Sequence, residues 1–570
     1  MLFYKRNILS FCIRCILKDK KQLYKSKSSA IHVENQSDWE AVIGLEIHAQ
    51  INSKTKLFSN SICDSEAPAN TLVSPFDMAA PGTMPVFKVL NRRCAEAAVL
   101  TGLALNCSIS RCSTFDRKHY FYPDMPAGYQ ITQYFQPIAK DGYVEFYVKN
   151  HDKESNELYR KRVNILRLQL EQDSGKLFSN EANDCIYVDL NRCGIGLMEI
   201  VTDCTLKNGA EAAALVKELQ IMMKALDTCR GRMERGEFRV DVNVSVRKCG
   251  EKSLRVRTEL KNLISFHFIS KAIDVEIARQ IELYEQGGEV INETRSYDNR
   301  AGKTIPMRDK EVHQDYRYMP EPNLPPLLVI SNEEEDESQI SQENFVNIDK
   351  LKSALLLLPN ILRDKWIEID KLPLSLACFI YDEAALRSYY TECVDVRRLD
   401  PIKVANILKN DLQLALKTKR MDIKRCKIPV QMMSSLVIDM LLNEDQRSPG
   451  QIVQDLQLTN IDDDQEIVKV CEEVLKNETE AVMKFKSGKS KILSRFLRLA
   501  SVQLRHRTSP EKLENIFLQL LNTNRPKDEN KTSHLNLCSN VDIHAPGNGI
   551  NRFVKANFIL PTSYDCVVFA

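Results

Sequence analysis

Two kinds of sequence signal are missing from this 570-residue chain. No run of about 18 apolar residues occurs, so the sequence predicts no membrane-spanning helix. The 17 cysteines are scattered, and the one C-x-x-C spacing, Cys12 with Cys15, has no second pair that would complete a zinc site. An odd number of cysteines without a regular framework is typical of reduced thiols in an interior compartment.

The common motifs for binding nucleotides or activating a nucleophile are missing as well. Gly488-Lys489-Ser490 resembles the end of a P-loop, but Met483 stands where the first glycine would be. No G-x-G-x-x-G follows a candidate strand, and no G-x-S-x-G is present. If this protein uses ATP, its site must therefore be of an uncommon kind.

An excess of one charge is missing over the whole chain but present at its beginning. The net charge of +2 excludes a uniformly basic protein, so any contact with nucleic acid must come from local patches. The first 33 residues carry eight Lys or Arg and a single acid, Asp19, with several serines. This composition predicts a mitochondrial transit peptide over residues 1–37, and the alternative interpretation is a disordered basic tail.

The length of the chain is enough for three or four domains. Short alternating strands with helical stretches near 91–105, 208–227 and 264–286 predict one large α+β domain over residues 38–330. An acidic run over 332–337 indicates a linker, and the pattern after it is helical, with Leu351, Leu355, Leu358 and Ile361 at helical spacing. We divide the remainder into a linker with a helical domain (331–423), a helical tail domain (424–522) and a variable extension (523–570).

The segment 238–247 is the most regular strand pattern in the chain. Strand alternation places Phe238 and the four valines on one face and the polar residues on the other. One interpretation is an ordinary amphipathic strand of a half-exposed sheet; the other is a sheet floor that presents polar groups to an anionic substrate. The residues of the polar face are Arg239, Asp241, Asn243, Ser245 and Arg247.

Three further segments carry carboxylates in strand-like patterns. Residues 42–51 place Glu46 and His48 on one side, 166–173 do the same with Glu171, and 191–201 carry Glu199 between apolar residues. Carboxylates gathered on strand faces suggest a hard-cation site, because Mg²⁺ prefers oxygen ligands. His48 suits Mg²⁺ less well than the carboxylates and is alternatively a residue that orients a carboxylate or the substrate. Taken singly, each residue fits a structural role; together they favour a site.

A basic stretch without any acid covers residues 481–510. On helices it makes a positive surface suited to an RNA backbone, although a charged run is more often only a solvated face. The candidate RNA-binding residues are Lys484, Lys486, Lys489, Lys491, Arg495 and Arg498.

Several long motifs resemble one family. The segment Phe115-Asp-Arg-Lys-His-Tyr-Phe-Tyr-Pro-Asp-Met-Pro-Ala-Gly-Tyr-Gln-Ile-Thr-Gln133, which we expect to be a loop, resembles the signature of the GatB family, the B subunit of the Asp/Glu-tRNA amidotransferase. The same pattern fits Val42-Ile-Gly-Leu-Glu-Ile-His48, Asp189-Leu-Asn-Arg192, Arg239-Val-Asp-Val-Asn-Val-Ser-Val-Arg247, Glu259-Leu-Lys-Asn262 and Asp315-Tyr-Arg-Tyr-Met-Pro-Glu-Pro322. The basic leader favours a mitochondrial member, located in the matrix.

The resemblance implies a cradle-like mixed-sheet catalytic domain, a helical region and a helical tail domain that embraces tRNA. It implies that ATP phosphorylates the side-chain carboxylate of Glu-tRNA(Gln), and that ammonia then displaces phosphate to give Gln-tRNA(Gln). Ammonia comes from an amidase-type A subunit, and a small C subunit clasps the two. The family positions for Mg²⁺ and phosphoryl transfer fall on Glu46, His48, Glu171 and Glu199.

Chemistry adds a group that we expect to bind the cofactor: Arg239 and Arg247 as bidentate phosphate ligands, with Asp241 and Asn243 between them.

Two positions depart from the family pattern H-L-E-E-D-A-G-K, because this chain has Gln169-Leu-Glu-Gln-Asp-Ser-Gly-Lys176. Gln169 and Gln172 leave open an alternative, a non-catalytic tRNA-binding scaffold of the same complex. A second alternative is the archaeal-type E subunit, but that type carries a large insertion where this chain has only the acidic linker. A stand-alone ATP-grasp or P-loop ligase would need a signature that the sequence does not contain.

Overall fold

The computed structural model describes most of the chain between residues 38 and 523. The described ranges are 38–64, 66–74, 90–119, 121–149, 157–180, 185–307, 316–331, 345–352, 355, 358–418, 420–423, 426, 428–442, 464–486, 492–504 and 508–523. The expected transit peptide 1–37, the acidic run 332–337 and all of the extension 523–570 except Thr523 lie outside the described residues.

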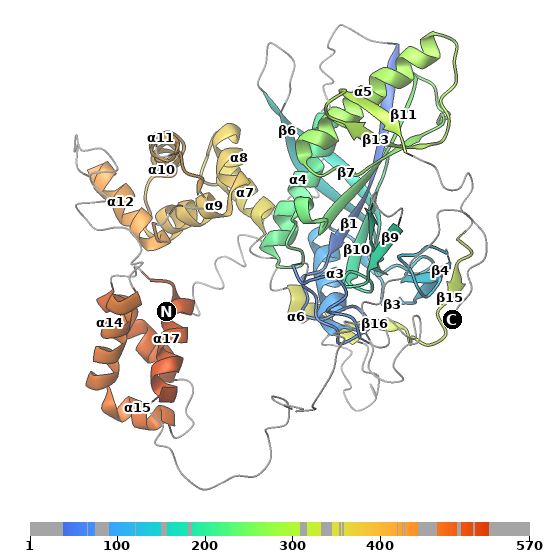
Figure 1. Ribbon diagram of the computed structural model, residues 1–570. Helices are drawn as coiled ribbons and strands as arrows, with labels where there is room; N and C mark the ends of the chain where they lie inside the picture. Colours follow the sequence, from blue (N-terminus) through green and yellow to red (C-terminus); the bar gives the residue numbers. More distant parts are fainter. Residues whose placement is uncertain are drawn as a thin grey trace, which may run out of the picture.

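A nine-stranded mixed sheet forms the floor of the N-terminal part (Figure 1). Its order is β14-β13-β12-β11-β1-β10-β7-β6-β2, and all pairs are antiparallel except β12 with β13. The bounds are β1 Trp39–Gln50, β2 Ser108–Ile109, β6 Ala139–Lys149, β7 Leu158–Gln172, β10 Gly196–Thr202, β11 Phe238–Lys248, β12 Thr258–Lys261, β13 Thr294–Asp298 and β14 Lys303–Pro306.

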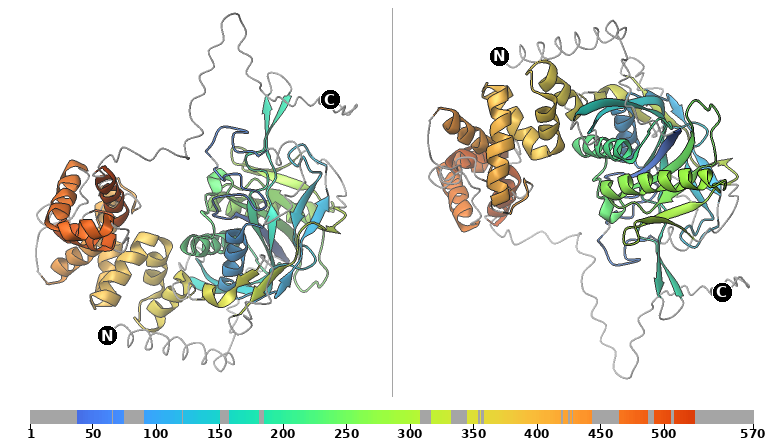
Figure 2. Two further views of the ribbon diagram at one scale, coloured as in Figure 1. Left: turned by 90° about the horizontal axis from the view of Figure 1, so that it is seen from below. Right: turned by 90° about the horizontal axis from the view of Figure 1, so that it is seen from above.

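Three helices cover the apolar side of this sheet: α3 Arg92–Ala104, α4 Gly209–Ala225 and α5 Phe266–Glu285 (Figure 2). Each begins at a residue whose side chain accepts a hydrogen bond from a backbone N–H of the first turn, namely Asn91, Asn208 and Ser265. The apolar rows of β1, β7, β10 and β11 and the inner faces of the helices form one continuous core. The polar rows of the same strands therefore face the other way, and the α+β prediction and its three helices are confirmed.

Smaller sheets stand beside the large one. They are β15-β4-β5, β17-β16-β3 and the hairpin β8-β9, with bounds β3 Cys112–Ser113, β4 Asp116–His119, β5 Tyr129–Thr132, β8 Lys176–Asn180, β9 Cys185–Asp189, β15 Met319–Pro320, β16 Leu327–Ile330 and β17 Phe345–Asn347; a 3₁₀ turn, η1, covers Met233–Arg235. The expectation that the segment 115–133 is a loop is wrong, because β4 and β5 pair as a hairpin. In this hairpin Lys118 lies opposite Gln130 and Asp116 lies opposite Thr132, so these four side chains share one face.

The C-terminal part is helical and has two further cores, one over 362–437 and one over 467–521, and we call the helices around them the first and the last helical group. The helices are α6 Ile348–Lys352, α7 Pro359–Glu368, α8 Leu374–Asp382, α9 Ala384–Thr391, α10 Pro401–Asn406, α11 Gln413–Thr418, α12 Val430–Leu442, α14 Asp464–Asn477, α15 Thr479–Lys486, α16 Leu493–Gln503 and α17 Pro510–Thr523, with π-helical turns η4 Glu392–Val396 and η5 Ile407–Leu412. No helix among the described residues is both long and apolar enough to cross a membrane.

Two sequence-based expectations need correction. The leucines at helical spacing do not share a helix, because Leu351 lies in α6 and Ile361 in α7, and the backbone at Leu358 is extended. The cause is Pro359, since a proline begins a helix readily and disfavours helical backbone at the residue before it. The strand expected over 191–201 begins only at Gly196, because the chain turns at Gly194 with φ +83°.

Candidate active site

Four neighbouring strands place a polar side chain at the same level of the sheet. His48 on β1 lies opposite Glu199 on β10 and opposite Arg239 on β11, and Glu199 lies in turn opposite Gln169 on β7. Directly opposed residues of antiparallel strands share a face. The strand register thus converts four separate sequence patterns into one polar row across the floor of the cradle.

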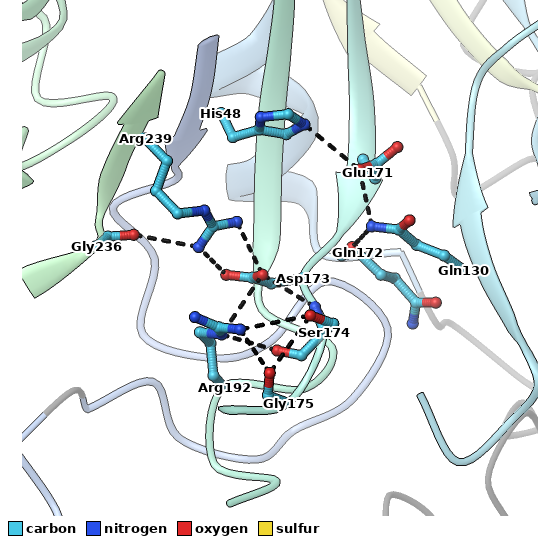
Figure 3. A network of polar contacts seen from close by, with 10 residues as sticks. All are labelled: His48, Gln130, Glu171, Gln172, Asp173, Ser174, Gly175, Arg192, Gly236 and Arg239. Carbon is cyan, nitrogen blue, oxygen red and sulfur yellow. Dashed lines mark hydrogen bonds and ion pairs between the residues drawn. The ribbon is translucent and has the colours of Figure 1, made fainter. Parts of the chain in front are cut away.

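Beside this row, three side chains converge on one point. Ligand atoms of His48, Glu171 and Glu199 all lie within 4.8 Å of one another. Figure 3 shows His48 and Glu171 pointing toward each other, with 3.9 Å between His48 Nε2 and Glu171 Oε1. Glu171 lies two residues after Gln169 on β7 and therefore points to the same side of the sheet. Among the candidate ligands of the described chain, these three form a cluster that can hold a metal ion.

The Glu171 carboxyl is the least compensated group of the cluster. Its side chain is buried, and its Oε2 atom has no hydrogen-bond partner among the described residues. Burial, with the help of the nearby Glu199 carboxylate, raises the pKa of Glu171 to about 7, against the opposing charge of Lys118. A buried carboxylate oxygen without a donor is costly unless something binds it, and a hard cation meets that need.

Two glutamine side chains hold the carboxylates in place. Gln169 Nε2 donates to Glu199 Oε2 over 2.7 Å and also to Thr132 Oγ1, and Gln130 Nε2 donates to Glu171 Oε1 over 2.8 Å. Both Gln130 and Thr132 belong to β5, so the small hairpin braces the large sheet. We call this pair, Gln130 and Gln169, the amide brace. Partners of this kind orient metal ligands and leave their other oxygens free.

The residues expected to bind the cofactor are held differently. Arg239 donates through both terminal nitrogens to Asp173, at 2.9 Å each, and Arg192 lies 3.6 Å from the same carboxylate (Figure 3). Burial by itself would raise the pKa of Asp173, but the two guanidinium groups outweigh it and lower the pKa. The expected phosphate-binding fork of Arg239 is thus occupied by a carboxylate in this structure.

The other expected residues line the same face farther along β11. Asn243 donates to Glu46 Oε1 over 3.2 Å, and Asp241 lies 3.3 Å from the Lys261 ammonium. Arg247 donates to Glu40 over 2.6 Å, and it lies eight positions beyond Arg239 on the same strand, a distance of about 26 Å. The structure brings Arg239 near the cluster and leaves Arg247 at the far end. Glu46 is on the correct face but outside the three-ligand cluster.

The expected RNA-binding residues belong to the last helical group where they are described. Arg495 and Arg498 are exposed on α16, and Arg495 also pairs with Glu478 over 3.0 Å. Lys484 and Lys486 lie in α15, where only their backbones are described, and Lys489 and Lys491 lie outside the described residues.

Sequence reasoning missed Lys118 and Gln130 as members of the site. Both lie in the segment 115–133, whose aromatic and basic residues drew attention as a whole. The signal that was available is strand alternation: interpreted as a hairpin, the segment places Lys118 opposite Gln130, on one face.

Comparisons with known proteins identify the family of this chain. Residues 41–335 match the family model described as the GatB/GatE catalytic domain, and residues 433–521 match the one described as the GatB domain. The chain is 41% identical to the B subunit of the mitochondrial glutamyl-tRNA(Gln) amidotransferase of Danio rerio, over 86% of this chain and 90% of the relative. It is 40% identical to the protein of the same name from Homo sapiens, over 85% of this chain and 89% of the relative.

A bacterial relative extends the pattern. The B subunit of the aspartyl/glutamyl-tRNA(Asn/Gln) amidotransferase of Wolbachia pipientis wMel is 38% identical, over 85% of this chain and 99% of the relative. With a catalytic-domain match over more than half of its length and relatives near 40% identity along most of it, this chain belongs to the GatB family.

Proposed function

We propose that this chain is the B subunit of a mitochondrial glutamyl-tRNA(Gln) amidotransferase, a ligase that forms the carbon–nitrogen bond of Gln-tRNA(Gln). The observation that carries the proposal is the convergence of His48, Glu171 and Glu199 on the polar floor of a GatB-family cradle. Relatives with this function in their names cover most of the chain, and four of them are named as mitochondrial. The basic leader over residues 1–37 agrees with import into the matrix.

The chemistry that we assign to the site has two steps. An oxygen of the glutamyl side-chain carboxylate attacks the γ-phosphorus of ATP, and ADP leaves. The nitrogen of ammonia then attacks the acyl carbon, phosphate leaves, and the new amide nitrogen gives up the extra proton. The first step brings two anions together, so it requires a site that screens negative charge.

The cluster fits Mg²⁺, because two of its three ligands are carboxylates and Glu171 Oε2 has no partner among the described residues. His48, Glu171 and Glu199 would hold the ion, which when bound would screen and orient phosphate oxygens. The amide brace of Gln130 and Gln169 holds the two carboxylates from behind. Glu46 lies two residues before His48 on β1, so it adds a further carboxylate to the same face of the sheet.

The remaining assignments concern partners. We assign ammonia supply to an amidase-type A subunit and the clasping of the complex to a small C subunit, because the sequence of this chain carries no nucleophile elbow of its own. We assign tRNA binding outside the acceptor end to the last helical group, on whose surface Arg498 is exposed. The scaffold alternative is less favoured, since Gln169 keeps its side chain hydrogen-bonded to Glu199 and the carboxylates remain.

The test is conversion of Glu-tRNA(Gln) to Gln-tRNA(Gln) by this chain with A and C partner subunits, ATP, Mg²⁺ and glutamine. In Glu171→Gln the charge disappears while the size of the side chain is kept, and we expect product formation to fall at least about 100-fold. Binding of tRNA should stay nearly unchanged. The unfolding temperature should stay the same or rise, because a buried charge without full compensation has been removed.

Glu145→Gln is the matched control. Glu145 lies on β6 of the same sheet and pairs with Arg160 near the surface, so its neutralisation should leave conversion unchanged. If Glu171→Gln converts Glu-tRNA as fast as Glu145→Gln, the metal assignment is wrong. If the wild-type complex binds tRNA tightly but makes no product even with free ammonia, the scaffold alternative holds.

A further inference from the structure

A lysine on the small hairpin faces the carboxylate cluster without belonging to it. Lys118 lies on β4 directly opposite Gln130 on β5, and Gln130 donates to Glu171. Cross-strand neighbours share a face, so the Lys118 side chain extends to the side on which Gln130 meets the cluster. The hairpin therefore brings one ammonium group close enough to Glu171 and Glu199 for their charges to interact.

This ammonium keeps its charge and has few partners. Its Nζ lies 4.7 Å from the centroid of the Tyr316 ring, an aromatic face that attracts a cation. Among the described residues, no acceptor hydrogen-bonds to it and no carboxylate comes within ion-pair distance. Burial alone would lower the pKa of Lys118, but the attraction of Glu171 and Glu199 outweighs burial and raises it.

The charges of the cluster indicate a role for the Lys118 ammonium group. Two ionised carboxylates match the two charges of Mg²⁺, so a loaded cluster by itself would offer phosphate the ion's open positions but no net positive charge. Lys118 adds one positive charge beside it. A lysine ammonium is a compact point charge that suits a phosphate oxygen, and it offers three donors that the described protein leaves unused.

We propose that Lys118 is a catalytic residue that binds an oxygen of the transferring phosphate, on the side of the cluster covered by the β4-β5 hairpin. This inference rests on the proposed function, because it takes the phosphoryl donor from it. Charge develops on the equatorial phosphate oxygens during transfer, so a fixed ammonium beside them stabilises the transition state more than the bound nucleotide. Removing it should consequently lower kcat as well as raise the KM for ATP.

The test compares Lys118→Met, Lys118→Arg and a control, Lys140→Met, in the complete complex with A and C subunits. Lys140 is exposed on β6 of the large sheet. We expect Lys118→Met to lower kcat/KM for ATP about 100-fold, Lys118→Arg to recover part of the loss, and the control to match the wild type. The Mg²⁺ concentration for half-maximal rate should stay equal or fall, because a like charge near the ion has gone.

Other outcomes would overturn the inference. An increase in the KM for Glu-tRNA alone, with the KM for ATP unchanged, would make Lys118 a ligand of the substrate carboxylate. A higher Mg²⁺ requirement together with a lower unfolding temperature, at normal KM for ATP, would make it structural.

A second readout separates this inference from the proposed function. Binding of a non-hydrolysable ATP analogue with Mg²⁺, measured by calorimetry on the complex, should weaken in Lys118→Met and not in Lys140→Met. If the wild type makes no Gln-tRNA but shows this difference, the proposed function fails and the phosphate site stands. If both variants bind the analogue equally, the phosphate site fails whatever the activity.

Discussion

Two buried glutamates in different regions of the molecule are treated in opposite ways. Glu171, in the floor of the cradle, is 2% exposed, and Glu218, where α4 meets the first helical group, is 4% exposed. Both oxygens of Glu218 accept hydrogen bonds from Arg363 of α7, at 3.0 and 3.1 Å. Glu171 accepts one from an uncharged amide, and its second oxygen has no partner among the described residues.

This difference distinguishes a carboxylate with a structural role, Glu218, from one that can bind a ligand, Glu171. At Glu218 the compensating cation is part of the chain, so the pair fixes α7 on α4 and needs nothing from solution. At Glu171 the nearest basic side chains are His48, with its Nε2 at 3.9 Å, and Lys118, which forms no ion pair with it, and neither donates a hydrogen bond to the carboxylate. A buried carboxylate that the protein leaves partly uncompensated is a candidate for binding, whereas a closed pair of equal burial is not.

The largest effect should come from breaking the closed pair. Arg363→Met removes the guanidinium and leaves the Glu218 carboxylate buried without a cation, which should lower the free energy of unfolding by about 3–5 kcal/mol. Urea unfolding of the purified chain, followed by circular dichroism, measures it. Arg160→Met, which breaks an exposed pair with Glu145, should cost at most about 1 kcal/mol. Equal losses in the two variants would remove the distinction between the closed pair and a surface pair.

A smaller effect should come from loosening the open site without touching its ligands. Gln169→Leu removes the donor that holds Glu199, and the apparent affinity for Mg²⁺ in the conversion assay should fall about 10- to 100-fold. Gln169→His restores a ring N–H at a position where the family pattern has histidine, so it should stay close to wild type.

The neighbouring glutamine provides the control for this brace. Gln172 uses its side-chain oxygen to accept from the Ile131 backbone and does not touch the cluster, so Gln172→Glu should leave the Mg²⁺ requirement unchanged. If Gln169→Leu also leaves it unchanged, Gln169 fills space and does not orient Glu199, and the amide brace reduces to Gln130.

The sequence predicts only those features of the site that the alternation of side chains along a strand determines. Alternation along one strand shows which residues share a face, so Glu46 with His48 and Arg239 with Asp241 were correctly placed on common faces. Alternation says nothing about which strand lies beside which. That β10 inserts between β1 and β7, and so brings Glu199 beside both His48 and Gln169, depends on long-range pairing.

The same limit explains why the sequence did not distinguish the two arginines and did not predict the hairpin. Arg239 and Arg247 are equivalent by pattern, yet only Arg239 lies near the cluster, because strand length separates them and local carboxylates bind each. The hairpin of β4 and β5 was hidden by its proline- and glycine-containing connection, a composition typical of loops. Lys118 therefore appears as a site residue only once the three-dimensional packing of this hairpin against β7 is known.

A third buried glutamate, Glu276, should show the smallest effect, and it extends the comparison of Glu171 with Glu218. Several hydrogen-bond donors of the protein surround its carboxylate. Glu276 of α5 is fully buried and accepts from Arg279, Gln280 and Thr304, the last across from β14. Burial alone would raise the pKa of Glu276, but these donors outweigh it and lower the pKa below its usual 4.5. A carboxyl with a lowered pKa in the folded state adds stability above pH 4.5, and the contribution disappears as the pH falls through the folded pKa.

Glu276→Gln should accordingly lower the free energy of unfolding by about 1–2 kcal/mol at about pH 7 and by progressively less between about pH 4.5 and pH 3. Urea unfolding of wild type and variant over this pH range measures the difference. A difference that stays constant with pH would show that packing of the amide, and not the carboxylate charge, sets the loss. In that case Glu276 would stabilise α5 through packing alone. Glu218 would then be the one of these glutamates whose buried charge is stabilised by donors of the protein itself.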